Sequence, residues 1–464
     1  MIARWFDPGR TRALLLLGGP IVAGMASQVV LNLVDTAMIG RLGPAPQAAV
    51  GLGSFTFLVL MNAVTCLGAA VQATASRRDG ENDSRGAGGA LDRGLLLAVG
   101  AGLPLGYGLS KLVPAFFPYL ASDPAVVVGA EGYSGGIAYL EIRVMAMGVV
   151  GANFCYRGFY NGIGRSKVYL VSIVLIQTLN IFFNWVFIYG NLGAEAMDVR
   201  GAALASVLAA VIGTCFYTFL TLVQRDVRTR YRPFRVANLG RSGFGAMIRL
   251  AWPEAVRGIG LMVSFLLFLE LHEAISTPAL AAGSILMNIG SAGFLPAMGM
   301  GLAGATMVGR HLGMKQPAEA RKIVWLGVRL TVCGLMLPAV LVACQPEPIL
   351  AIFTPDVGTM QAAKLGLQLF AATTVFDAIP IVLLYSMLGA GATRWVAGAQ
   401  LIQQYLVMLP LAALIGLVVM PELAAGREDL QVVGLWLGLG LSRMALGVVA
   451  VRRFRSSAWE DIEV

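Results

Sequence analysis

Three polar side chains recur on one face of the first long apolar segment of the chain. Gln28, Asn32 and Asp35 are separated by four and then three positions, a spacing that places them on one narrow face of a helix. A charge inside a membrane costs on the order of 2.5–3.5 kcal/mol and usually faces a cavity in which it functions. We therefore predict that Asp35 binds a cation or a proton. Gln28 and Asn32 either support that site or form a structural network between helices.

Pro20 precedes this polar face within the same apolar segment. A proline inside a helix removes one backbone hydrogen bond and lets the helix kink. We consider two roles for Pro20: a bend that couples the charge of Asp35 to the shape of the helix, and a static kink.

A second group of polar residues lies in the fifth and sixth apolar segments. Asn180 and Asn184 are four positions apart, and we expect Ser206 to approach them. Oxygen atoms of Asp, Asn and Ser suit a small hard cation such as sodium, whereas a lone buried aspartate can carry a proton. The sequence therefore predicts an ion-coupling site with sodium at Asp35 and Asn180, or a proton at Asp35. Asparagines that only join helices are the structural alternative.

The second half of the chain offers fewer charged candidates. Asp377 follows two threonines in an apolar segment and is the acidic candidate of that half. Glu254 and Arg257 are three positions apart, which favours a structural ion pair. Arg143 and Arg443 are interpreted as side chains that extend toward the membrane surface.

Composition identifies the environment as lipid. Of the 464 residues 57% are hydrophobic and only 13% charged, whereas soluble domains carry roughly 25% charged residues. The net charge of +9 comes from basic residues between apolar segments, so the positive-inside rule explains it better than nucleic-acid binding. Five cysteines without a CxxC spacing and two histidines near predicted loops indicate buried thiols, no disulfide framework, no His-based metal centre and no cofactor.

Twelve segments are long and apolar enough to cross a membrane. Basic residues concentrate in alternate loops, which predicts a multi-pass protein of the inner membrane with both termini in the cytoplasm. The segments are residues 14–38, 48–76, 94–114, 136–158, 168–189, 201–222, 251–271, 281–309, 325–343, 362–390, 395–419 and 432–451.

The two halves of the chain resemble each other. Pro20 matches Pro253 and Arg77 matches Arg310 at an offset of 233 positions, and Phe268 stands where Asp35 would recur. We predict an all-α membrane fold of two pseudo-symmetric six-helix bundles: an N-terminal lobe over 1–225, a basic cytoplasmic linker over 226–250 and a C-terminal lobe over 251–464. Parallel repeats of this kind are typical of secondary transporters.

Several motifs resemble those of the multidrug and toxic compound extrusion (MATE) family. The matching runs cover nearly the whole chain in the family's order: Leu33-Val34-Asp35-Thr36-Ala37-Met38-Ile39-Gly40-Arg41-Leu42-Gly43, Tyr160-Asn161-Gly162-Ile163-Gly164-Arg165, Gly201-Ala202-Ala203-Leu204-Ala205-Ser206, and the segment from Pro296 to Gly313.

The resemblance implies twelve helices in two bundles and antiport of organic cations against sodium or protons. It implies an ion-coupling site at Asp35 with Asn180, Asn184 and Ser206, a supporting Tyr139, and a second acid at Asp377. Many members have a second acidic residue where this chain has Asn184, and this departure favours proton over sodium coupling.

The expected function is cation-coupled export of amphipathic, mostly cationic small molecules by a monomer that is not an enzyme. A lipid-linked saccharide flippase of the same superfamily is one alternative. An integral-membrane enzyme is another, although the scarcity of histidine argues against it.

Overall fold

The computed structural model describes residues 7–121, 123–130, 133–423 and 426–462. These residues are helical except for loops and one short antiparallel pair, Gly129–Ala130 (β1) with Tyr133–Ser134 (β2). Eleven described helices are long and apolar enough to cross a membrane, and the bent pair α5 (Gly136–Met145) and α6 (Met147–Gly162) can together form a twelfth span. The predicted all-α membrane fold of twelve spans is thereby confirmed.

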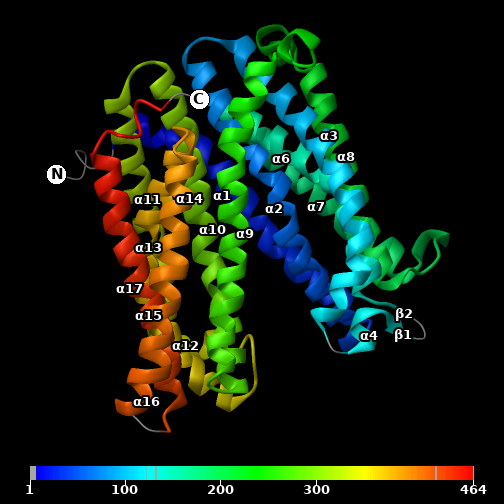
Figure 1. The fold of residues 1–464 in the computed structure, drawn as a ribbon, viewed down its shortest axis with the longest axis vertical. Coiled ribbons are helices and arrows are strands. Elements are labelled where there is room, and N and C mark those ends of the chain that lie inside the picture. The colour runs from blue at the N-terminus through cyan, green and yellow to red at the C-terminus, as the bar shows by residue number, and fades with distance from the viewer. Residues whose placement is uncertain (1–6, 122, 131–132, 424–425, 463–464) are drawn as a thin grey trace. The chain divides into compact units, whose positions relative to one another are not determined.

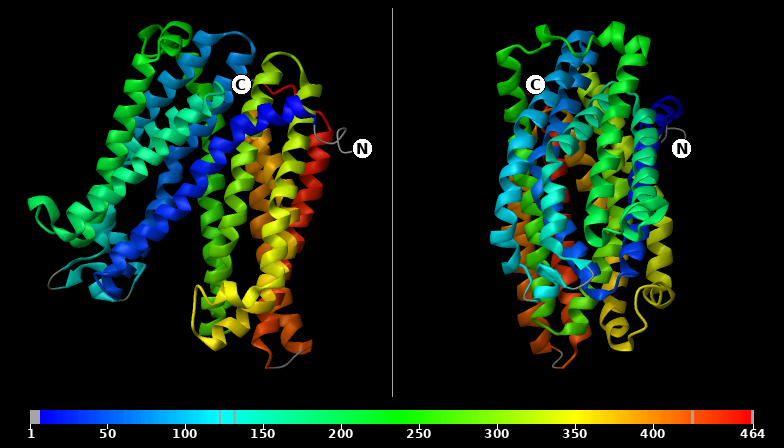
Figure 2. Two further views of the ribbon diagram at one scale, coloured as in Figure 1. Left: turned by 180° about the vertical axis from the view of Figure 1, so that it is seen from behind. Right: turned by 90° about the vertical axis from the view of Figure 1, so that its right-hand side faces the viewer.

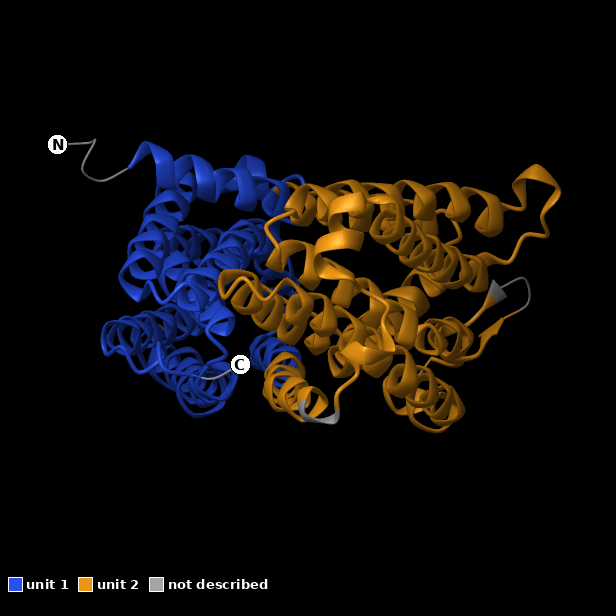
Figure 3. Ribbon diagram, turned by 90° about the horizontal axis from the view of Figure 1, so that it is seen from above, with its two compact units in different colours: residues 1–22, 260–463 blue, residues 23–259, 464 orange. Residues whose placement is uncertain are grey.

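The helices form two compact units, which Figure 3 shows in different colours. Residues Ala23–Ile259 form one, here called the N-unit, and Met1–Val22 with Gly260–Glu463 form the other, here called the C-unit. Figures 1 and 2 show the long helices of each unit lying side by side.

The N-unit holds most of α1 (Pro8–Gly40) and the start of α9 (Arg241–Glu273). Between them lie α2 (Pro44–Gly80), α3 (Ser84–Phe116), η2 (Phe117–Tyr119), α4 (Pro124–Val127), α5, α6, α7 (Ser166–Tyr189), η3 (Asn191–Gly193), α8 (Asp198–Val223), η4 (Val227–Tyr231) and η5 (Val236–Asn238).

The C-unit contains the rest of α9 and the helices that follow it. They are α10 (Thr277–Gly313), α11 (Pro317–Cys344), α12 (Pro346–Leu350), α13 (Val357–Gly389), α14 (Thr393–Ile402), η6 (Gln403–Met408), α15 (Leu409–Ala413), η7 (Leu414–Val419), α16 (Met420–Leu423) and α17 (Glu428–Arg455).

The two units exchange the opening segments of α1 and α9. The start of α1 packs within the C-unit, where Arg10 forms an ion pair with Glu319 at 2.8 Å. The start of α9 packs within the N-unit, where Met247 and Leu250 join its buried core. Helix α9 begins at Arg241, so residues 241–250 of the predicted linker are helical. The division into 1–225, 226–250 and 251–464 stays a prediction.

Buried aromatic residues pack against one another in the core of each unit. In the N-unit, Tyr156 of α6 and Tyr217 of α8 stack with ring centroids 5.3 Å apart. In the C-unit, Phe268 and Phe370 pack against Trp436. The expectation of buried thiols is only partly right, because three of the five cysteines are exposed.

Glycines of α3 contact the chain on both sides of the 52° bend between α5 and α6. A Cβ atom on Gly106 would lie 2.2 Å from the Val144 carbonyl oxygen, and one on Gly102 would lie 2.7 Å from the Gly148 Cα atom. Because no side chain separates these backbones, α3 supports the chain on both sides of the bend. The bend orients α5, which carries Tyr139 and Arg143.

The segment after α8 is attached to the N-unit by two buried carboxylates. Asp92 accepts hydrogen bonds from the Phe234 backbone nitrogen at 2.8 Å and from Asn238 Nδ2 at 2.6 Å. Tyr231 donates its hydroxyl to Asp79 at 2.8 Å. Burial, together with this neighbouring carboxylate, raises the pKa of Tyr231 to about 12, so the hydroxyl keeps its proton. The part of the predicted linker before α9 is therefore held on the N-unit.

Replacement of Gly106 by valine is expected to destabilise the protein, because the new side chain would collide with the backbone of α5. Overpacking of this kind costs about 1–3 kcal/mol. The thermal unfolding midpoint of the purified protein in detergent measures the effect. Gly108→Val in the same helix is the matched control, since nothing lies within 4 Å of a Cβ atom at that position. Equal midpoints for the two variants would contradict the proposed packing.

Candidate functional site

Asp35 lies at the centre of a hydrogen-bonded group inside the N-unit. Its side chain is half-buried near the end of α1, and Asn184 Nδ2 of α7 donates to Asp35 Oδ1 at 2.7 Å. Asn184 and Asn180 are buried, at 1% and 4% exposure. The structure therefore brings together the acid of the first span and the asparagines of the fifth span.

Asn180 joins Asp35 to α8 in either orientation of its amide. In one orientation Asn180 Nδ2 donates to Ser206 Oγ at 3.0 Å, and Asn184 donates to Asn180 Oδ1 at 3.2 Å. In the other, the Asn180 nitrogen lies 3.0 Å from Asp35 Oδ1, and Ser206 donates to the Asn180 oxygen at 3.0 Å. Either way, Asp35, Asn180, Asn184 and Ser206 form one connected group, which we call the Asp35 cluster.

The Asp35 cluster contains one carboxylate and several neutral oxygen atoms. Asn184 Oδ1 is buried and accepts no hydrogen bond from the described residues. Oxygen atoms of these types are ligands for small hard cations, and a single carboxylate among amides can also hold a proton. The described residues contain no group of three or more His, Cys, Asp or Glu side chains that could hold a metal ion.

Gln28, Asn32 and Pro20 lie in α1 but outside the Asp35 cluster. Gln28 is half-buried and Asn32 exposed. Neither side chain forms a hydrogen bond with another described residue. Asn32 takes part only through its backbone carbonyl oxygen, which accepts a hydrogen bond from Thr36 Oγ1 at 2.8 Å. Pro20 lies inside the unbroken helix, three residues before the N-unit begins. Their supporting roles stay predictions.

Tyr139 of α5 is buried beside α2. Its hydroxyl lies 2.8 Å from Ser54 Oγ, and a Cβ atom on Gly53 would lie 2.7 Å from the tyrosine ring. One turn further along α5, the Arg143 guanidinium lies over the rings of Phe57 and Tyr139, with its central carbon 4.3 Å and 5.8 Å from their centroids. Arg143 interacts electrostatically with Asp35. We did not predict this role for Arg143, although its spacing of four from Tyr139 could have indicated it.

Asp377 lies in the C-unit and is not part of the Asp35 cluster. Its side chain is 5% exposed in α13 and forms an ion pair with Arg443 of α17. The interpretation of Arg443 as a side chain that extends toward the membrane surface is therefore wrong. A coupling role for Asp377 stays a prediction, but the pairing also gives it a structural role.

Two further polar groups in the membrane spans have local partners. Glu254 and Arg257 form the expected ion pair within α9. His272, near the end of α9, is fully buried. Its Nδ1 atom lies 2.8 Å from the Phe268 carbonyl oxygen, and its Nε2 accepts from Trp436 Nε1 at 3.0 Å. These bonds assign the ring proton to Nδ1 and hold the imidazole as part of the C-unit core.

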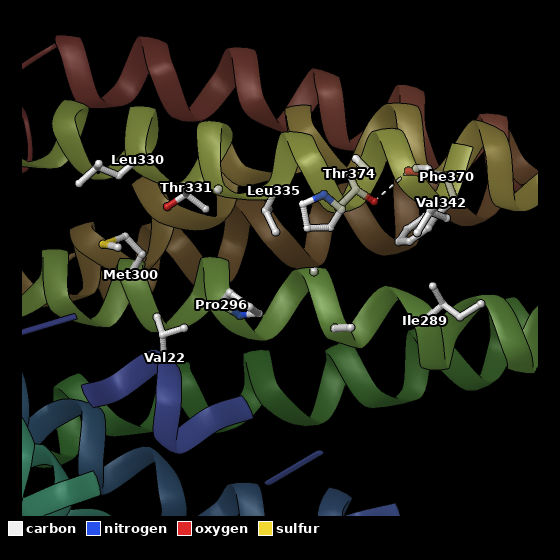
Figure 4. A pocket seen from close by; sticks show the side chains of 16 residues that line it. Val22, Ile289, Pro296, Met300, Leu330, Thr331, Leu335, Val342, Phe370 and Thr374 are labelled. Carbon is white, nitrogen blue, oxygen red and sulfur yellow. Dashed lines mark hydrogen bonds between the residues drawn. The ribbon is translucent and has the colours of Figure 1, made fainter. Parts of the chain in front are cut away.

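A cavity of about 350 Å³ lies in the C-unit among α10, α11 and α13. Figure 4 shows Pro296 and Met300 on one side, facing Leu335. The hydroxyls of Thr331 and Thr374 donate hydrogen bonds within their own helices, to the carbonyl oxygens of Gly327 and Phe370, each at 2.8 Å. The walls are therefore apolar, as expected for a site that binds the apolar part of a small molecule.

These features are those of a polytopic membrane transporter with a carboxylate inside each of its two bundles. The chain belongs to the MatE family, whose sequence profile matches residues 20–186 and 255–414. The resemblance read from the sequence is thereby confirmed. The family consists of transporters of the multidrug efflux class, so the chain is a membrane transporter and not an enzyme.

Curated relatives match along nearly the whole chain. The probable multidrug resistance protein NorM of Thermotoga maritima is 23% identical over 457 residues, which cover 98% of this chain and 94% of the relative. The probable multidrug resistance protein NorM of Pseudomonas aeruginosa is 26% identical over 462 residues, covering 96% of this chain and 90% of the relative.

Solved structures share the fold at low sequence identity. A transporter of the MOP superfamily from Pyrococcus furiosus has a TM-score of 0.87 at 18% identity and covers 98% of this chain and 97% of its own. An outward-facing multidrug resistance MATE transporter has a TM-score of 0.86 at 18% identity, with the same coverages of 98% and 97%. At this level of identity the likeness shows the fold alone.

Replacement of Arg443 by glutamine is expected to leave the buried Asp377 carboxylate without its partner. Breaking a buried ion pair from one side costs about 3–5 kcal/mol. The double variant Asp377→Asn/Arg443→Gln is expected to recover most of the stability, because no uncompensated charge remains. Thermal unfolding midpoints of the three proteins in detergent test this. A double variant that transports at the wild-type rate would contradict a coupling role for Asp377.

Proposed function

We propose that this protein exports amphipathic, mostly cationic small molecules across the inner membrane by antiport against protons that bind at Asp35. The observation that carries the proposal is the Asp35 cluster, in which one half-buried carboxylate has only neutral hydrogen-bonding partners. Such a carboxylate can attract an organic cation when ionised and release it when protonated.

The exchange requires that the two conformations of the transporter differ in affinity for the proton and the substrate. Protonation of Asp35 from outside removes the negative charge, weakens the binding of a cationic substrate and favours return to the inward-open state. Deprotonation toward the cytoplasm restores the charge for the next substrate. Pro20 supports such a cycle because it lies in α1 near the point where the helix passes from one unit to the other.

Sodium is the alternative coupling ion. Asn184 Oδ1, which accepts no hydrogen bond from any described residue, and the oxygen atoms of Asp35, Asn180 and Ser206 are of the types that bind sodium. We favour the proton because the cluster holds a single carboxylate, since Asn184 is neutral. A proton needs one basic oxygen, whereas a sodium ion needs several ligands and enough negative charge to offset its dehydration.

The apolar cavity of the C-unit supports amphipathic substrates, because it can accept their apolar part without leaving polar groups unpaired. The half-buried Asp35 carboxylate and these apolar walls also favour a multidrug exporter over the flippase, which must accommodate a polar saccharide. The alternation of basic loops supports an orientation with both termini in the cytoplasm. Each lobe contains its own site elements, so a monomer suffices.

Asp35→Asn is expected to abolish most of the coupled transport, because an amide cannot gain or lose a proton in this range. We expect the rate of ethidium transport in liposomes under an imposed pH gradient to fall about tenfold or more. Asp226→Asn is the control, because the Asp226 side chain is 79% exposed. Wild-type rates for Asp35→Asn would contradict the proposal, and a rate driven by a sodium gradient at constant pH would identify sodium as the coupling ion.

A further inference from the structure

Arg143 is a charged side chain held inside the N-unit by aromatic rings. It lies two residues before the end of α5 and is half-buried. Its guanidinium carbon is 4.3 Å from the Phe57 ring centroid and 5.8 Å from that of Tyr139. Stacking of this kind attracts a guanidinium to the negative face of a ring but does not neutralise its charge.

No described carboxylate lies within ion-pair distance of Arg143, and its Nε atom is buried without a hydrogen-bond partner. The arginines of two other membrane spans differ in this respect. Arg257 pairs with Glu254, and Arg443 pairs with Asp377. The positive charge of Arg143 therefore remains available to act on its surroundings.

The aromatic support of Arg143 is rigid. Phe57 and Tyr139 are 3% and 4% exposed, and the Tyr139 hydroxyl is fixed by Ser54 at 2.8 Å. The tyrosine ring also occupies the space where a side chain on Gly53 would stand. Because the rings cannot move easily, the guanidinium is held at a defined place relative to α1.

Arg143 and Asp35 lie on helices that pack together. Ile39, one turn after Asp35 in α1, and Tyr139, one turn before Arg143 in α5, belong to one buried cluster. The Arg143 guanidinium interacts electrostatically with the Asp35 carboxylate. Glu141 lies two positions away on α5, which turns it to another face of the helix. Three other titratable groups of the neighbouring elements are engaged elsewhere: Tyr139 with Ser54, Tyr189 with the Met38 carbonyl oxygen, and Asp198 with the Ser134 backbone nitrogen.

We propose that Arg143 is a fixed counter-cation of Asp35 that excludes sodium from the Asp35 cluster and restricts coupling to protons. The ionised carboxylate and the guanidinium together have no net charge, and Asn184 adds none. A proton forms a covalent bond with the carboxylate and needs no other ligand. A sodium ion would be repelled by the guanidinium without a second carboxylate to compensate. This inference rests on the proposed role of Asp35 as the coupling residue.

Two consequences separate an electrostatic role of Arg143 from a structural one. The guanidinium favours the ionised carboxylate, so Arg143→Gln should let Asp35 bind its proton at higher pH. We expect the pH midpoint of ethidium transport in liposomes to move up by about one pH unit. Without the positive charge, the cluster should also bind sodium, so the thermal unfolding midpoint of Arg143→Gln should be higher in sodium chloride than in potassium chloride of equal strength.

Matched variants control for the loss of stacking and for general destabilisation. Arg143→Lys keeps the charge and is expected to behave like the wild type in both measurements, with no difference between sodium and potassium. Arg157→Gln removes another stacked arginine of the N-unit, whose guanidinium carbon lies 4.7 Å from the Tyr169 ring centroid. It is expected to leave both the pH midpoint and the response to sodium unchanged.

The proposal is overturned if the wild type unfolds at a higher temperature in sodium chloride than in potassium chloride. It is also overturned if Arg143→Gln has the wild-type pH midpoint of transport and the same unfolding midpoint in both salts. It is also overturned if Arg143→Lys behaves like Arg143→Gln, since the charge would then not be the cause. Failure of the proposed function is a different result, in which Asp35→Asn transports ethidium at the wild-type rate. The thermal measurement in detergent needs no transported substrate, so it decides the role of Arg143 in either case.

Discussion

An ionised side chain in a hydrocarbon environment must be neutralised, paired or solvated, and this requirement organises the polar interior of the protein. In α9, and between α13 and α17, the requirement is met by direct ion pairs. In the Asp35 cluster it is met differently, because Asp35 has neutral amides as contacts and a guanidinium only at longer range. The carboxylates of Glu254 and Asp377 are stabilised as anions because each contacts an arginine directly. Asp35 is the carboxylate whose charge can change at moderate cost.

The position of Arg143 depends on close packing of helix backbones at the adjacent bend. Gly102 and Gly106 of α3 bring that helix against the bend between α5 and α6. The direction of α5 in turn places Tyr139 over Gly53 and Arg143 over Phe57. Small residues in membrane helices thus have two effects here: they permit tight packing, and they fix the direction from which a charge acts on Asp35.

Much of the architecture could be predicted from the sequence, because apolar length and the alternation of basic loops are local properties. The grouping of Asp35 with Asn180, Asn184 and Ser206 could also be predicted, since helical periodicity and the family resemblance both indicated it. The role of Arg143 could not be predicted from the sequence. The direction of its side chain depends on the bend between α5 and α6, and a bend without a proline leaves no local signal in the sequence. The burial of His272 depends on Trp436, and the partner of Asp377 is Arg443; in both cases the partner lies far along the chain.

The exchanged segments of α1 and α9 have a consequence for how the protein is made. The ribosome completes the first half of the chain before the start of α9 has been synthesised, so the N-unit then lacks the residues that include Met247 and Leu250 of its core. The opening segment of α1 must likewise wait for Glu319 and the helices around it. The N-unit is continuous from Ala23 to Ile259 and is complete once the start of α9 has been made, whereas the C-unit combines residues from both ends of the chain. The N-unit can therefore pack first, and the opening segment of α1 joins its final neighbours only when the C-unit is assembled.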